Sequence, residues 1–452
     1  MKNQSRRAGA WLVQILIDYS FINVSFFFLL LLLPGRAHAL ALPQQLEIAL
    51  KAAREHNHAV GISRAQLAEQ HAAVVQALAL FTPTVQANGG YLRSQYESSF
   101  QVPAASGPNG IVFQTYVMQP YNALTGNVSV NVPLLMPSAY AHYSGARYGS
   151  DAASHSERAS ESDVLLQTAR IYYQVVAAQG VVEAAERALT TARDGLRVAE
   201  ARLAQGTETP LAVDRANVDV GQATQTLAVA RQTLGVARRT LETLTGTTFN
   251  ERFPAPKDAT SVATSEDDFV ERALRQRPEV LSADAALAQQ EAGLKEAYLQ
   301  LTPRVTGSFT EYFTNITGFL GKEAYWTAGV NLTWQIDPVG TSGAVRRAQA
   351  LVEEQRQRLL QTRDTVRDDV HTVWLEIEAD RGRLEAAESQ ARNAIDGLEQ
   401  AKKQFLYGTA TSLEVSAAAR DAFNAEATLA QVRADLSGAL IALEKAAGEP
   451  LL

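Results

Sequence analysis

Two hydrophobic patterns alternate along this chain of 452 residues. Proline-free stretches rich in alanine and leucine occupy 138–205 and 341–407. Short stretches alternate between apolar and polar residues instead, as in NVSVNV at 127–132 and VNLTWQI at 330–336. A period of two predicts strands with one apolar and one polar face. Proline-free stretches of this length predict helices far longer than those of ordinary globular proteins.

The whole pattern occurs twice. VEAAE at 182–186 and LEAAE at 384–388 are 202 residues apart. Upstream, FTPTV at 81–85 and LTPRV at 301–305 are 220 residues apart. The offset falls from 220 to 202, so the first copy carries 18 extra residues within 92–124. Their proline and glycine content predicts a loop.

The duplication defines the predicted organisation of the chain. A first repeat spans 40–248, a linker follows at 249–268, and a second repeat spans 269–452. Each repeat begins with a helix, over about 43–80 and 267–301, that ends before Thr-Pro. The remaining elements of the first repeat are predicted as strands 82–93 and 126–136 and helices 138–205 and 210–245. Those of the second are strands 303–313 and 325–337 and helices 341–407 and 412–447. The fold class is therefore mainly α, with four strands per chain.

Two similar phrases mark the ends of the long helices. AQGTETPLAV at 204–213 and LYGTATSLEV at 406–415 each place a glycine directly after a helix. A left-handed cap favours glycine there, so Gly206 and Gly408 are predicted to end these helices. Thr209 precedes a proline at the first position of the next helix, and Thr411 and Glu414 have the spacing of a capping box. The sequence therefore predicts two helix-to-helix hairpin tips.

The first 39 residues differ from the rest. Basic residues precede the apolar run FINVSFFFLLLLL at 21–33, and small residues lead to Ala39. This order is typical of a secretory signal peptide, predicted here at 1–39 with cleavage after Ala39. A membrane anchor is the alternative interpretation, but the run is short for a span of about 20 residues. The length of the basic segment leaves open whether Met1 is the true start.

Strands with an apolar face in an exported chain indicate an outer-membrane β-barrel. Four strands cannot close one, since single-chain bacterial barrels begin at eight strands. Open sheet edges are not tolerated in lipid, because their backbone groups would have no hydrogen-bond partner. We therefore expect three chains to share one barrel of twelve strands. The helices would continue from it as a tube in the periplasm.

The chain resembles the TolC-like outer-membrane efflux proteins. The resemblance covers the whole mature chain and rests on the duplicated unit, on Leu-Thr-Pro at 301–303 with Thr-Pro at 82–83, and on the two tips. It implies a homotrimeric channel-tunnel in the outer membrane, with no catalytic activity and no cofactor. It also implies partners, namely a periplasmic adaptor and an inner-membrane transporter that selects the cargo.

The same resemblance assigns roles at the tips. Residues of the tip glycine motifs would contact the adaptor: Gly206, Thr207, Gly408 and Thr409. Glu414 lies six positions after Gly408, where the family often has an acidic pore constriction. The first copy has Ala212 at that position.

Other functional classes fit the sequence less well. A net charge of -7 argues against nucleic acid as a partner. His56, His58 and His71 are interpreted as surface residues rather than metal ligands. Trp326, Tyr325 and Phe319 suit either an aromatic girdle or packing within a loop. Two alternatives to small-molecule efflux remain open: a type I protein-secretion channel, and a non-channel periplasmic coiled coil or adaptor.

Overall fold

The computed structural model describes residues 42–107, 110–249, 251–254, 265–316 and 322–452. The predicted signal peptide at 1–39 and its cleavage site at Ala39 lie outside the described residues. So do residues 250 and 255–264 of the predicted linker.

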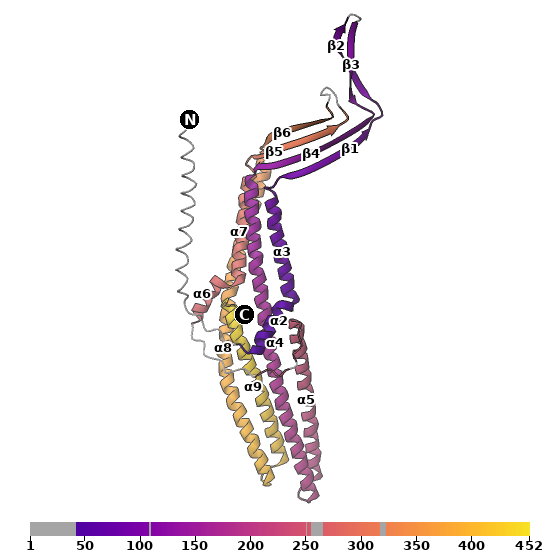
Figure 1. Cartoon of the computed structure of the whole chain (residues 1–452). Helices are drawn as coiled ribbons and strands as arrows, with labels where there is room; N and C mark the ends of the chain where they lie inside the picture. The colour runs from indigo at the N-terminus through magenta and orange to yellow at the C-terminus, as the bar shows by residue number, and fades with distance from the viewer. Residues whose placement is uncertain (1–41, 108–109, 250, 255–264, 317–321) are drawn as a thin grey trace, which may run out of the picture. The chain divides into compact units, whose positions relative to one another are not determined.

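Each repeat contains two short helices, two strands of a shared four-stranded sheet and two long helices, in that order, and the first repeat has two further strands between its sheet strands (Figure 1). The elements of the first repeat are α2 Gln44–His56, α3 His58–Ala79, β1 Thr84–Arg93, β2 Ser98–Gly107, β3 Gly110–Gln119, β4 Asn122–Leu135, α4 Pro137–Ala204 and α5 Pro210–Thr245. Those of the second are α6 Glu266–Gln276, α7 Pro278–Leu299, β5 Arg304–Thr314, β6 Ala324–Thr333, α8 Pro338–Leu406 and α9 Ser412–Ala446. The fold class, a duplicated helical unit with a four-stranded sheet, is confirmed. Among the described residues, no helix combines the length and hydropathy that crossing a membrane requires.

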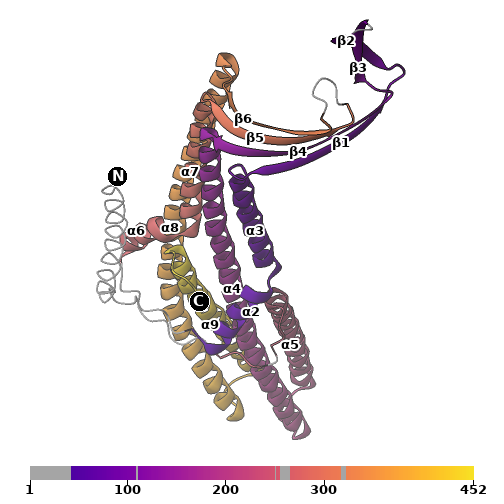
Figure 2. The same cartoon turned by 45° about the horizontal axis from the view of Figure 1, so that its top comes forward.

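The sheet joins the two repeats. Its strands lie in the order β1-β4-β5-β6, and all neighbours are antiparallel (Figure 2). The joint between the repeats is the pairing of β4 with β5, in which Val130 lies opposite Phe309. Within the described residues, β1 and β6 are therefore the open edges of the sheet. An open edge leaves a row of backbone donors and acceptors available for another strand.

The structure differs from the prediction in the segment between β1 and β4. The proline- and glycine-rich stretch was expected to be a loop, but it contains two further strands, β2 and β3, which form a separate two-stranded sheet. Its proline and glycines suggested a loop, although β3 reads IVFQTYV at 111–117, a β-branched and aromatic run typical of strands. The first two predicted strands, β1 and β4, are thus joined by a hairpin where a loop was predicted.

Aromatic side chains pair across β5 and β6. Trp326 stacks on Phe309 with ring centroids 6.0 Å apart, and Tyr325 stacks on Tyr312 at 5.0 Å. Cross-strand aromatic pairs of this kind stabilise a sheet and fix its register. Phe319, which the sequence grouped with them, lies outside the described residues.

Both opening helices are interrupted once, which corrects the prediction of one continuous helix in each repeat. The interruptions fall at Asn57 and Arg277, whose backbones are extended with ψ values of 130° and 128°. Pro278 disfavours a helical backbone at Arg277. Asn57 has no proline after it, and its side chain caps α3 by accepting a hydrogen bond from the N–H of Ala59 at 2.9 Å.

The side chains at the two interruptions contact the long helices of their own repeats. Asn57 donates to the carbonyl of Leu244 at the end of α5, at 3.1 Å. Arg277 is only 4% exposed and pairs with Glu279 at 3.0 Å and Asp369 at 2.9 Å. Burial by itself would lower the pKa of Arg277, but hydrogen bonds and charges from its two carboxylate partners raise it above its ordinary value. Asn57 thus fixes the end of the returning helix α5, and Arg277 ties the second interruption to the outgoing helix α8.

The long helices approach one another closely because their contact positions are small. Alanines recur among the buried residues of α4 and α9. Gly180 of α4 lies so near Ala430 of α9 that a methyl group added to the glycine would be 2.7 Å from the alanine Cβ. Larger side chains fill the wider spaces, where fully buried Tyr172 meets Phe253 edge-on at 5.0 Å.

Candidate functional site at the hairpin tips

The two tips close in the same way. Gly206 and Gly408 have φ values of 70° and 79°, the left-handed conformation that the sequence predicts for them. The hydroxyl of Thr207 donates to the carbonyl of Arg202 at 3.2 Å, and that of Thr409 donates to the carbonyl of Gln404 at 3.1 Å. The backbone N–H groups of Thr207 and Thr409 donate to the same two carbonyls, so each threonine closes the end of its helix, α4 or α8, with two hydrogen bonds. The glycine-threonine pairs thus act as caps in both repeats.

The two helices that return from the tips, α5 and α9, start differently from each other. In α9 the capping box is complete: Glu414 accepts from the N–H of Thr411 at 2.7 Å, and Thr411 accepts from the N–H of Glu414 at 3.3 Å. In α5, Thr209 occupies the predicted cap position, but its side chain makes no capping hydrogen bond. Pro210 at the first helical position needs no N–H partner, which reduces the demand for a cap. The second tip is therefore tied together more firmly.

Arg202 joins the two tips to each other. Its guanidinium donates to the carbonyls of Phe405 and Leu406, the latter at 3.3 Å, and lies over the Phe405 ring at 4.4 Å from the centroid. A cation at the end of α8 is favoured there by the negative end of the helix dipole. Sequence reasoning missed this residue, although the 202-residue offset pairs it with neutral Gln404 and so marks a difference between the copies.

The surface between the tips is hollowed and carries apolar side chains. A groove of about 500 Å³ lies between them, with Arg202, Thr207, Glu208 and Gly408 in its lining. Large apolar side chains are exposed around it, led by Tyr407 at 84% exposure, with Leu211, Leu406 and Leu413. Exposed apolar patches rimmed by polar residues are typical of protein-binding surfaces.

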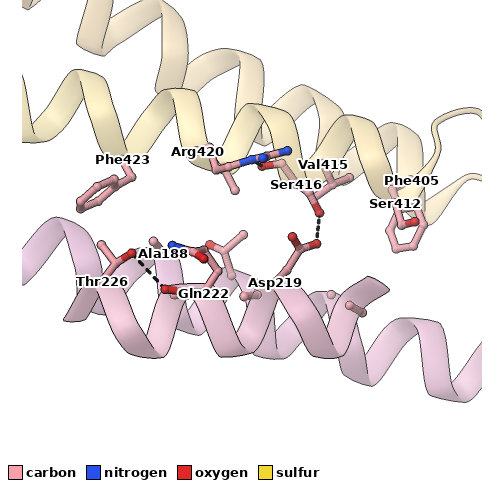
Figure 3. Close-up of a pocket in the computed structure, with 16 residues that line it drawn as sticks. Ala188, Asp219, Gln222, Thr226, Phe405, Ser412, Val415, Ser416, Arg420 and Phe423 are labelled. Atoms are coloured by element: carbon pink, nitrogen blue, oxygen red, sulfur yellow. Dashed lines mark hydrogen bonds between the residues drawn. The ribbon is translucent and has the colours of Figure 1, made fainter. Parts of the chain in front are cut away.

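A smaller cavity extends from the second tip between the two hairpins. It measures about 100 Å³ and is lined by residues of both repeats (Figure 3). The hydroxyl of Ser416 on α9 donates to the carboxylate of Asp219 on α5, and Phe405 and Phe423 lie at the opposite ends of this view. Arg187 on α4 reaches Glu426 on α9 at 3.1 Å. Polar contacts therefore link the two hairpins at two places, one of them in the lining of the cavity.

A sequence comparison identifies the protein family of this chain. The model of the outer membrane efflux protein family matches residues 49–247 and 269–449, one segment in each repeat. The chain belongs to the outer membrane efflux protein family. No curated protein sequence matches the chain.

Solved structures share the fold of this family member. The outer membrane channel CmeC of Campylobacter jejuni is 16% identical, with 90% of this chain and 86% of CmeC covered and a TM-score of 0.73. The outer membrane protein VceC of Vibrio cholerae is 17% identical, with coverages of 90% and 97% and a TM-score of 0.72. The open state of the Neisseria gonorrhoeae channel MtrE is 17% identical, with coverages of 90% and 89% and a TM-score of 0.71.

Membership makes the protein an outer-membrane efflux channel, with helices that extend into the periplasm, and not an enzyme. The alternative of a non-channel coiled coil or adaptor is therefore wrong. In the described part of the chain, no three histidine, aspartate or glutamate side chains are grouped so that they could hold a metal ion. His71 instead hydrogen-bonds Ser150 at 3.0 Å.

Glu414 has one role that the structure describes. Its carboxylate accepts from the backbone N–H of Thr411 and also from the Thr411 hydroxyl at 3.0 Å, and these bonds lower its pKa. Both bonds go to the same oxygen, so the other carboxylate oxygen is not used by the cap. Ala212, its counterpart in the first repeat, is buried. The two tips thus differ in charge at this position.

Proposed function

We propose that this channel is a homotrimer and the exit duct of a tripartite efflux pump for small molecules. The observation that supports the trimer is the four-stranded sheet with β1 and β6 as open edges. Large apolar side chains are exposed on these edge strands, among them Val85, Leu92, Trp326 and Val330. Three sheets joined edge to edge give twelve strands and no free edge, which satisfies both the backbone and the lipid.

The number of chains can be measured directly. Native mass spectrometry of the protein purified from outer membranes in detergent is expected to give the mass of three chains. A barrel that stays folded as a monomer would contradict the proposal. Light scattering under the same conditions provides an independent mass.

Cells that lack the gene for this channel show whether its cargo is small molecules or a secreted protein. Loss of an efflux duct should raise the susceptibility of the cells to dyes, detergents or antibiotics and leave their secreted proteins unchanged, and the cloned gene should restore resistance. Unchanged susceptibility together with the loss of one secreted protein would favour the second candidate, a type I secretion channel.

We assign the tips, with Gly206, Thr207, Gly408 and Thr409, as the docking surface for a periplasmic adaptor that links the channel to an inner-membrane transporter. The support is the exposed apolar rim of the groove and the distance of the tips from the sheet along helices of 68 and 69 residues. Helices of that length extend about 100 Å.

Substitution of the tip glycines tests docking. Gly206→Glu and Gly408→Glu each place a charged side chain at a left-handed position, at a cost of about 1 kcal/mol or more. Nothing lies within 4 Å of the added carbon at either glycine, so the trimer should still assemble. Efflux should fall, as measured by dye accumulation. Gly206→Asn and Gly408→Asn are the controls, because asparagine tolerates this backbone conformation, and they should retain efflux. Normal efflux in the double Glu variant would exclude docking at these residues.

We also propose that Glu414 forms a ring of three carboxylates at the pore constriction. A carboxylate ring attracts cations and repels anions. Hydrogen bonds from Thr411 favour the charged carboxylate of Glu414 and lower its pKa, whereas the two like charges of its neighbours in a ring would raise it.

Glu414→Gln separates this role from capping. Glutamine can still complete the capping box, but it carries no charge. Purified channels with this substitution should show a weaker cation preference in planar bilayers than the parent, with unchanged thermal stability. An unchanged ion preference would mean that Glu414 acts only as a cap.

A further inference from the structure

The two repeats pair their strands in the same register. The repeat offset is 220 residues between β1 and β5 and 202 residues between β4 and β6. Val85 of β1 lies opposite Val130 of β4. The counterparts of these two residues, Val305 and Leu332, lie opposite each other in β5 and β6. A strand contact seen in one place can therefore be transferred to the other repeat by the two offsets.

The long helices of the two repeats correspond equally well. Arg231 on α5 pairs with Glu186 on α4 at 2.8 Å. Arg433 on α9 and Glu388 on α8, each 202 residues further along the chain, pair at 2.9 Å. The returning helix thus lies on the outgoing helix in the same register in both repeats.

The two repeats meet along a joint inside the chain. In the sheet, β4 of the first repeat pairs with β5 of the second, with Val128 opposite Glu311. In the helical part, α4 of the first repeat packs against α9 of the second. There, a methyl carbon added to Gly180 would lie 2.7 Å from the Cβ of Ala430. The joint therefore brings the second sheet strand and outgoing helix of one repeat against the first sheet strand and returning helix of the other.

The counterparts of these joint surfaces are exposed in the described part of the chain. The offsets convert β4 and β5 into β6 and β1, which are the open edges of the sheet. They convert Gly180 into Gly382 on α8, and Ala430 into Ala228 on α5. Gly382 and Ala228 are both exposed, and nothing lies within 4 Å of a carbon added to Gly382. The same pair of small residues thus recurs where the chain itself supplies no close packing.

We propose that the seam between two copies, where β6 and α8 of one meet β1 and α5 of the next, repeats the internal joint. In this seam Val330 lies opposite Tyr91 of the next copy, and Gly382 meets its Ala228. The seam joins unlike surfaces head to tail, as in interfaces that close into rings. The trimer is then a ring of similar repeats, two from each chain. This inference rests on the proposed trimer and specifies which residues hold it together.

The side chains of the two edge strands fit this register. Tyr91 and Val330 are 64% and 69% exposed, so their pairing covers two large apolar side chains. Leu332 then lies opposite Gly89, which leaves space for the larger side chain. A shift of one residue would turn the apolar face of one strand toward the polar face of the other.

Cysteine cross-linking tests the register, because the chain has no cysteine of its own. In the full-length variant Tyr91→Cys/Val330→Cys, oxidation by copper phenanthroline should convert most of the purified protein into a covalent trimer on a non-reducing denaturing gel. Within one chain, β4 and β5 separate the two thiols by three strand spacings, about 14 Å, which is too far for a disulfide.

The matched controls shift the register by two residues on the same face. Tyr91→Cys/Ala328→Cys and Tyr91→Cys/Leu332→Cys place the thiols on diagonal positions, about 7–8 Å apart, and should cross-link several-fold less. Native mass spectrometry of the parent protein separates the two hypotheses: a mass other than three chains contradicts the proposed trimer itself. Intact trimers in which the 91–330 pair cross-links no better than the controls overturn the proposed seam.

Gly382 tests the helical half of the seam. Gly382→Ala should lower the temperature at which the trimer dissociates in detergent, although alanine favours the helix more than glycine does. Adding Ala228→Gly should restore that temperature, since it removes the opposing methyl group in the next copy. Gly397→Ala on the same helix is the matched control, because nothing lies within 4 Å of a carbon added to Gly397 or to its counterpart Gly195. If Gly382→Ala dissociates at the same temperature as this control, α8 and α5 do not meet as the seam requires.

Discussion

Gly448→Ala should lower the free energy of unfolding of the helical part of the channel by about 3 kcal/mol. Gly448 has a φ of +83°, which an alanine adopts only with strain. The added methyl carbon would also lie 3.0 Å from the backbone nitrogen of Arg277 and 3.1 Å from the carbonyl carbon of Gln276. Backbone atoms cannot rotate away, so the end of α9 must move from the α6–α7 interruption.

Movement of the end of α9 should weaken two ion pairs and lower the midpoint of thermal unfolding. Arg272 pairs with Glu449 at 2.6 Å, and Lys445 pairs with Glu279 at 3.4 Å, so both contacts depend on where α9 ends. Thermal unfolding followed by far-ultraviolet circular dichroism should show a clearly lower midpoint for Gly448→Ala.

Gly408→Ala is the matched control. This glycine has nearly the same φ, +79°, but nothing lies within 4 Å of the added carbon. It should therefore show only the cost of the left-handed backbone, about 1 kcal/mol. Equal midpoints for the two variants would mean that the contact at Arg277 has no energetic weight.

Gly180→Leu is expected to separate α4 from α9 and to prevent assembly of folded trimers. Even a methyl group at this position would be 2.7 Å from the Cβ of Ala430, and a leucine adds three more carbons. Overpacking of a closely packed core costs about 1–3 kcal/mol, and the contact recurs in every copy of the chain. The yield of trimer from outer membranes, measured by native mass spectrometry, should fall steeply.

Exchanging Gly180 and Ala430 tests whether the close approach of α4 and α9 causes the loss of stability. Gly180→Ala should be destabilising despite the better helix propensity of alanine, which is worth about 1 kcal/mol. Adding Ala430→Gly removes the opposing methyl group, so the double variant should recover most of the lost stability. If Gly180→Ala proved as stable as the parent, the proximity of the two helices would not limit packing here.

Much of this architecture could be predicted from the sequence because it is encoded locally. Proline disfavours a helical backbone at the residue before it, so Pro83 and Pro303 indicate where the opening helices stop. Gly206 and Gly408 indicate the tips because a left-handed cap favours glycine in any context. The repeat offset then showed that both halves share one plan, and the count of four strands required more than one chain.

The remaining features depend on contacts between residues far apart in the chain. The β2–β3 hairpin was missed because its proline and glycines are typical of loops, and only the pairing of Val102 with Gln114 and its neighbours makes it a sheet. Arg202 became part of the tips because α4 lies beside the end of α8, and Gly180 matters because α9 brings Ala430 against it. Local chemistry determined where the long helices and the opening helices end. Which elements touch was decided by packing in the tertiary structure, where the distance between two small residues depends on the whole bundle.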